Sequence, residues 1–193
     1  MKLYCSIIGI AMAVISAVNI AFDTASWYYV IAATVWCTAL QFVFDGMLAA
    51  LVHRMPDRWF GVDNPLFAVS ERERALYKRL RVRYWKDKVW ELGGLGGFSK
   101  RKVEAPDDPK YIERFLVECN KGVLTHRLSY PIGFLAMLTV PNACALTVAL
   151  PVAAVNLFLN ILPTIVLRYN TPMLKAVLLR LEKKKEREAV SLT

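Results

Sequence analysis

Residues 128–167, LSYPIGFLAMLTVPNACALTVALPVAAVNLFLNILPTIVL, form the longest part of the chain without a charged side chain. A helix needs about 20 apolar residues to span a bilayer, so this stretch is long enough for two crossings. Its best turn signal is Pro141 followed by Asn142. We therefore predict a transmembrane hairpin over residues 128–168, with a short first arm that extends back through the preceding helix.

Two apolar runs near the N-terminus predict another transmembrane hairpin, residues 1–52. Residues 3–22 carry no charge and suit a spanning helix, although Lys2 before an apolar run also fits a cleaved signal peptide. We favour the helix because a second run, residues 27–52, follows after only a few residues. That run begins with Trp27, Tyr28 and Tyr29, residue types enriched at the membrane interface.

Asp45 interrupts the second apolar run near its end. An acid within a membrane is costly and usually faces protein or water, which makes it a candidate functional residue. Its position near the boundary also fits a carboxylate that simply reaches the interface. Both interpretations remain open from the sequence.

The basic residues predict which parts of the chain face the cytoplasm. Residues 53–127 hold 17 of the 25 Lys and Arg, and seven more follow Leu167. Cytoplasmic flanks of spans are enriched in Lys and Arg, so the middle segment and the tail should lie on the same side. We predict four spans, both termini in the cytoplasm, a basic segment over residues 53–127 and a basic tail over residues 169–193.

The composition supports an all-α, polytopic membrane protein with about four transmembrane helices and a cytoplasmic amphipathic middle segment. Hydrophobic residues make up 56% of the chain and its mean hydropathy is +0.35. The net charge of +9 favours an anionic membrane surface as partner over nucleic acid. Two histidines and four scattered cysteines form no metal-ligand spacing, and we expect no metal or cofactor.

His126 is the candidate catalytic residue that spacing indicates. Asp107, Asp108 and Pro109 predict the start of a helix that ends in the membrane. The positions on one of its faces follow three- and four-residue steps: Ile112, Phe115, Leu116, Cys119, Val123 and His126. An imidazole at a membrane surface can act as a general base toward a hydroxyl. Alternatively, His126 only ends the apolar face.

Four short blocks in the same order give the chain a resemblance to a known family: MPDRWF at 55–60, YWKDK at 84–88, the helix with Glu118 and His126, and the last span with Asn160, Pro163 and RYN at 168–170. The chain resembles the bacterial glycosyl-diaponeurosporenoate acyltransferases, which place a fatty acyl group on a sugar hydroxyl in carotenoid biosynthesis. The resemblance implies an O-acyltransferase of the bacterial cytoplasmic membrane.

The resemblance also implies roles for individual residues. His126 matches the family's histidine, the expected base, and Glu118 matches its acid. Asn160 falls in the last matching block. The remaining implied substrate-binding residues are Trp85, Lys86, Asp87, Arg168, Tyr169 and Asn170. An arginine suits an anionic acyl carrier or a lipid phosphate, although Arg168 also fits a positive anchor at the end of a span.

The chain departs from the family beside the histidine. Val123 stands where a glutamate is usual, and Arg127 stands where an aromatic residue is usual. Thr171 and Met173 replace further arginines. These departures leave open the tuning of His126 and the identity of the acceptor, which is expected to be a glycolipid or a glycosylated terpenoid.

We expect a membrane acyltransferase that uses acyl-CoA, acyl carrier protein or phospholipid as its acyl donor. Membrane lipid, donor and acceptor would be its partners, and the oligomeric state is not predicted. The alternative is a non-enzymatic membrane adaptor, whose middle segment and Lys183, Lys184 and Lys185 bind acidic lipids or a partner enzyme.

Overall fold

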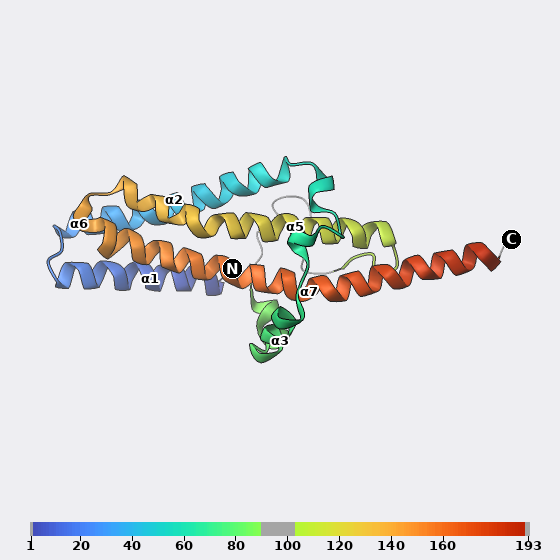
Figure 1. Ribbon diagram of the computed structural model, residues 1–193. Helices are drawn as coiled ribbons and strands as arrows, with labels where there is room; N and C mark the ends of the chain where they lie inside the picture. Colours follow the sequence, from blue (N-terminus) through green and yellow to red (C-terminus); the bar gives the residue numbers. More distant parts are fainter. Residues whose placement is uncertain (1, 90–102, 192–193) are drawn as a thin grey trace. The chain divides into compact units, whose positions relative to one another are not determined.

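A computed structural model describes residues 2–89 and 103–191 (Figure 1). These residues form helices joined by turns and contain no strand, which confirms the all-α prediction. Part of the predicted basic segment, residues 90–102, lies outside the described residues. The chain divides into two compact units, Met1–Val52 with Thr125–Leu162, and His53–Leu124 with Pro163–Thr193.

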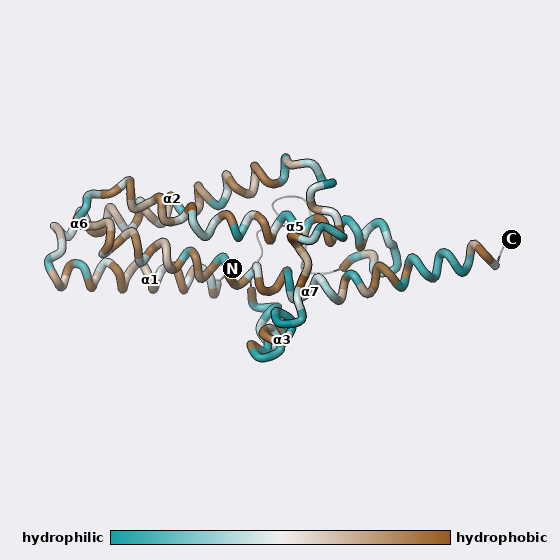
Figure 2. Tube along the Cα trace, in the orientation of Figure 1, coloured by the Kyte–Doolittle hydropathy of each residue, from teal (hydrophilic) through white to brown (hydrophobic). Residues whose placement is uncertain are grey.

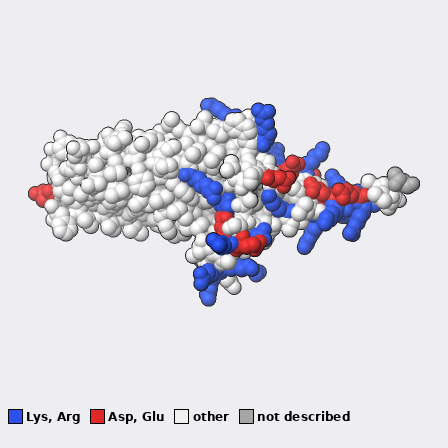
Figure 3. All heavy atoms as spheres, in the orientation of Figure 1, with Lys and Arg blue, Asp and Glu red and all other residues white. Residues whose placement is uncertain are grey.

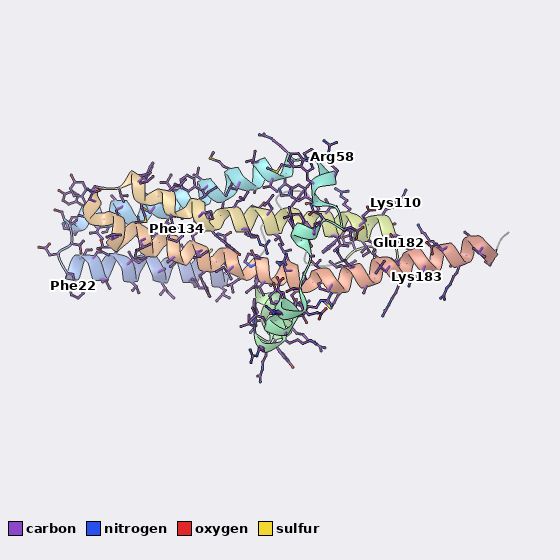
Figure 4. The ribbon with its side chains drawn as sticks, in the orientation of Figure 1. Phe22, Arg58, Lys110, Phe134, Glu182 and Lys183 are labelled. Carbon is purple, nitrogen blue, oxygen red and sulfur yellow. The ribbon has the colours of Figure 1, made fainter. Side chains whose placement is uncertain are left out.

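The first unit contains the residues of the predicted N-terminal hairpin and, of the second predicted hairpin, residues 128–162. Helices α1 (Lys2–Ala21) and α2 (Trp27–His53) are joined by a short turn, where Figure 4 labels Phe22. Helix α5 (Pro109–Ile132) continues as a 3-10 segment, Gly133–Thr139, where Phe134 is labelled. The chain turns at Val140 and Pro141 as predicted, and returns through α6 (Asn142–Cys144), a π-helical segment (Ala145–Ala149) and α7 (Leu150–Ser191).

Small apolar side chains form the core of the first unit, where α1, α2 and the returning arm pack. Its buried members are Ile15, Val30, Ala33, Cys37, Ala136, Cys144, Val148, Ala149 and Val152. Lipid tails are as apolar as these side chains, so the hydrophobic effect does not drive helices together within a membrane. Small residues let the helices approach closely, and van der Waals contacts then favour their association. The packing thus fixes the faces of α2 and α7 that meet inside this unit.

Three helices are long and apolar enough to cross a membrane: Leu3–Ala21, Trp27–His53 and Asn142–Ser191. Figure 2 shows α1 and α2 as predominantly hydrophobic. Large apolar side chains such as Ile10, Trp36 and Phe42 are exposed on them, as expected for surfaces that contact lipid. The protein is therefore an all-α membrane protein, while a fourth span through α5 and its 3-10 extension stays a prediction.

The second unit is built on the charged parts of α5 and α7. Short helical segments precede them: Asp57–Phe60, Pro65–Phe67, α3 (Glu71–Arg79), α4 (Val82–Trp85) and Lys86–Lys88. The predicted apolar face of α5 is buried here from Ile112 to Val123, with at most 3% exposure at its predicted positions. Figure 3 shows Lys and Arg interspersed with Asp and Glu on the C-terminal part of α7, where Figure 4 labels Glu182 and Lys183.

Candidate active site

His126 is partly buried in the first unit, where its ring meets an amide from α7. The distance between His126 Nδ1 and Asn160 Oδ1 is 2.7 Å. Asn160 itself is only 5% exposed. The structure thus brings together two of the residues expected in the site, from positions 34 residues apart.

The other contacts of Asn160 determine which ring nitrogen of His126 carries the proton. Asn160 Nδ2 donates to Asp45 Oδ2 at 3.2 Å, to the Asn156 carbonyl at 3.1 Å and to Asn156 Oδ1 at 3.2 Å. Since all of these groups are acceptors, the amide nitrogen must face them and Oδ1 must face the ring. His126 Nδ1 therefore donates to Oδ1, and the lone pair of the neutral ring lies on Nε2.

A second layer of amides lies next to this contact in the first unit. Asn156 Nδ2 donates to Gln41 Oε1 at 3.0 Å, and Gln41 Nε2 donates to the Gly133 carbonyl at 2.9 Å. Gln41 and Asp45 are one turn apart on α2, as Asn156 and Asn160 are on α7. We call these five side chains, with the Gly133 carbonyl, the polar ladder: Gln41, Asp45, His126, Asn156 and Asn160.

Gly133 is required for the close approach of Gln41 to the backbone. A Cβ atom at this position would lie 2.7 Å from Gln41 Oε1 and 3.3 Å from Asn156 Nδ2. We expect Gly133→Ala to displace the Gln41 amide and to lower the free energy of unfolding by about 1–3 kcal/mol. Thermal unfolding in detergent measures this, with Gly46→Ala as control, because a Cβ there has no atom within 4 Å. Equal stability of the two variants would contradict it.

Glu118 lies in the second unit against the other histidine of the chain. Its Oε2 is 3.5 Å from His53 Nε2, and its Oε1 is 3.5 Å from Lys121 Nζ. Lys121 Nζ is also 2.6 Å from Asp57 Oδ1. Burial alone lowers the pKa of Lys121, but the hydrogen bonds and charges of Asp57 and Glu118 outweigh it and raise that pKa. A catalytic role for Glu118 stays a prediction.

Arg168 is buried in the second unit and bound to an acid from α3. Its Nε donates to Glu73 Oε1, and its Nη2 donates to Glu73 Oε2 at 2.6 Å and to the Ala68 carbonyl at 2.8 Å. The Tyr77 hydroxyl also donates to Glu73, and burial and this bond raise the pKa of Tyr77. Glu73 therefore neutralises Arg168 and holds its guanidinium in place.

The second unit also contains the expected substrate-binding residues Trp85, Lys86, Asp87, Tyr169 and Asn170. Lys86 Nζ is 3.5 Å from Asn170 Oδ1 and 6.0 Å from the centre of the Tyr169 ring. Trp85 Nε1 donates to the Leu80 carbonyl, while Asp87 is exposed. The structure thus brings Lys86, Tyr169 and Asn170 together. A substrate-binding role for these residues stays a prediction.

Polar residues spaced by four in the apolar runs are the signal that could have indicated which residues of the polar ladder face inward. Gln41 and Asp45 share one helical face, as do Asn156 and Asn160, and such faces turn inward in a membrane. Glu73 and His53 offered no comparable signal. Among the described residues, no group of three or more His, Cys, Asp and Glu side chains could hold a metal ion.

Comparison with protein families matches residues 56–180 to the model described as glycosyl-4,4'-diaponeurosporenoate acyltransferase. The match covers more than half of the chain and includes the expected site residues from Trp85 to Asn170. Neither the search of curated proteins nor the search of solved structures found a match. The chain therefore belongs to the glycosyl-4,4'-diaponeurosporenoate acyltransferase family, whose activity is acyl transfer to a glycosylated carotenoid.

Proposed function

We propose that the protein moves a fatty acyl group from an activated donor to a sugar hydroxyl of a glycosylated carotenoid or a related glycolipid, with His126 as general base. The observation that carries this proposal is the 2.7 Å contact between His126 Nδ1 and Asn160 Oδ1. It holds the ring in the tautomer whose Nε2 can accept a proton. A base must have that lone pair in a fixed direction to act on a bound hydroxyl.

The proposed reaction is a single acyl transfer. His126 Nε2 accepts the proton of the acceptor hydroxyl while the hydroxyl oxygen attacks the acyl carbonyl carbon. The carbon–sulfur bond of a thioester donor, or the carbon–oxygen bond of a phospholipid ester, then breaks. The imidazolium returns its proton to the leaving thiolate or alkoxide, which restores the neutral ring and releases the new ester.

The acceptor and the acyl tail of the donor are expected to lie in the bilayer. The acyl tail and the carotenoid are apolar and share the membrane with α1, α2 and α7, so their encounter is confined to one layer. We propose a cytoplasmic face for the site because acyl-CoA and acyl carrier protein are cytoplasmic donors. Lys86, Tyr169 and Asn170, which lie together in the second unit, are proposed to bind substrate.

Acyl transfer by the purified protein tests this function. The protein in lipid nanodiscs is given a glycosylated diaponeurosporenoate acceptor and, in separate reactions, labelled acyl-CoA, acyl carrier protein or phospholipid. We expect a labelled ester from at least one donor, detected by chromatography and mass spectrometry. Absence of label in the acceptor with all three donors would contradict the proposed acyl transfer.

The adaptor alternative predicts a different pattern of variants in cells. A lipid-binding adaptor should tolerate His126→Ala but lose function when Lys183, Lys184 and Lys185 are all replaced by alanine. An acyltransferase should show the reverse. Acylated carotenoid in cells that carry each variant distinguishes the two functions.

A further inference from the structure

We propose that Asp45 is a positioning residue for the acyl transfer, acting on His126 through the amide of Asn160. This inference rests on the proposed role of His126 as base. Asp45 and His126 come from different helices of the first unit, and Asn160 of a third helix lies between them. Asn160 Nδ2 donates to Asp45 Oδ2 at 3.2 Å, and Asn160 Oδ1 lies 2.7 Å from His126 Nδ1.

The charge of Asp45 is distinctive for its location. In the first unit, the acids are Asp23, in the turn before α2, and Asp45. The basic residues are Lys2 and Arg127, and Arg127 is exposed. Asp45 is thus an acid of the first unit that Asn160 links to His126, in a span where a carboxylate carries a high solvation cost.

The hydrogen bonding of Asp45 is incomplete for a purely structural carboxylate. Its Oδ1 is buried and has no hydrogen-bond partner among the described residues. Polar groups that only join helices normally satisfy both ends, as Gln41 and Asn156 do in the next layer of the polar ladder. An acid that has unused acceptor capacity and is linked to a base through one amide instead suits a site where positive charge develops during reaction.

Asp45 has two effects on His126 in this arrangement. By accepting from Asn160 Nδ2 it keeps the amide turned so that Oδ1 faces the ring, which maintains the Nε2 lone pair. Its negative charge also polarises the amide and stabilises the imidazolium formed when His126 takes the proton. The second effect requires the charge, whereas the first requires only an acceptor.

Asp45→Asn separates the charge from the hydrogen bond, because the amide oxygen can still accept from Asn160. We expect kcat to fall about 10- to 100-fold, the range seen for groups that orient a functional histidine, with KM changed little. Loss of the carboxylate disfavours the imidazolium, so the acidic limb of the kcat–pH profile should move to lower pH. Asp23→Asn is the matched control, since Asp23 has a φ of 49° that asparagine adopts readily.

Thermal unfolding of each variant in detergent separates a role in the reaction from a role in helix packing. The proposal predicts that Asp45→Asn lowers kcat more than it lowers Tm, whereas a role confined to packing predicts that any loss of kcat follows a loss of Tm.

Two outcomes would overturn the inference while leaving the proposed function intact. One is Asp45→Asn with the kcat and pH profile of Asp23→Asn, in a protein that His126→Ala inactivates. The other is a decrease in kcat on Asp45→Asn that is equally large when His126 is already replaced by alanine. A residue that acts through the ring cannot affect kcat once the ring is removed. Activity that survives His126→Ala would instead remove the proposed base.

Discussion

Replacement of His126 by alanine is expected to reduce kcat for acyl transfer by about 100- to 10,000-fold, the usual contribution of a positioned general base. Without the imidazole, the acceptor hydroxyl must lose its proton to water as it attacks. KM for the acceptor should change little, because the ring's main role is in the transition state. Initial rates of the purified variant, at saturating donor and varied acceptor, measure both constants.

His53→Ala is the matched control for this prediction, since His53 is the only other histidine in the chain. Its ring is exposed and lies 3.5 Å from Glu118. We expect it to keep most of the wild-type kcat. If His53→Ala lost as much activity as His126→Ala, the assignment of the base to His126 would be wrong.

Removal of Glu73 is expected to destabilise the second unit strongly. The side chains of Arg168 and Glu73 are 6% and 21% exposed, and the guanidinium donates to both carboxylate oxygens. Glu73→Ala leaves a buried positive charge without its partner, which typically costs about 3–5 kcal/mol. Thermal unfolding in detergent should show a marked decrease in Tm.

A neighbouring ion pair on the same helix provides the control. Glu71 and Arg74 are 2.9 Å apart, but their side chains are 85% and 46% exposed. Exposed pairs contribute little, so Glu71→Ala should leave Tm almost unchanged. Similar Tm values for Glu73→Ala and Glu71→Ala would show that the buried pair does not stabilise the fold.

The pairing also bears on the two sequence-based interpretations of Arg168. An arginine that binds an anionic donor needs donor atoms directed at the ligand. Glu73 and Ala68 engage Nε and Nη2, while Nη1 is buried with no hydrogen-bond partner among the described residues. Glu73 is 95 residues away in the sequence, in α3, most of whose residues are charged. No local pattern could indicate that one of its acids turns inward, because that depends on tertiary packing.

The fold followed from local properties of the chain. Charge-free runs predicted the spanning helices, Pro141 predicted the turn, and three- and four-residue steps predicted the buried face of α5. These features depend on side chains near one another in sequence, which is why hydropathy and helical periodicity detect them.

The site depended on contacts that periodicity does not encode. Substrate binding by Asn160 stays a prediction, and the structure brings its amide against His126. Asp45 was recognised as an unusual acid, but its partner lies 115 residues away. Which inward polar residue meets which partner is decided by the register between helices, so the polar ladder emerged only from the structure.

A structure of the protein with its glycosylated acceptor bound tests the central claim most directly. We predict that the hydroxyl to be acylated lies about 3 Å from His126 Nε2, while Nδ1 keeps its contact with Asn160. An ordered acceptor whose hydroxyls are all out of hydrogen-bonding reach of His126, in a complex that forms the ester on addition of donor, would contradict it.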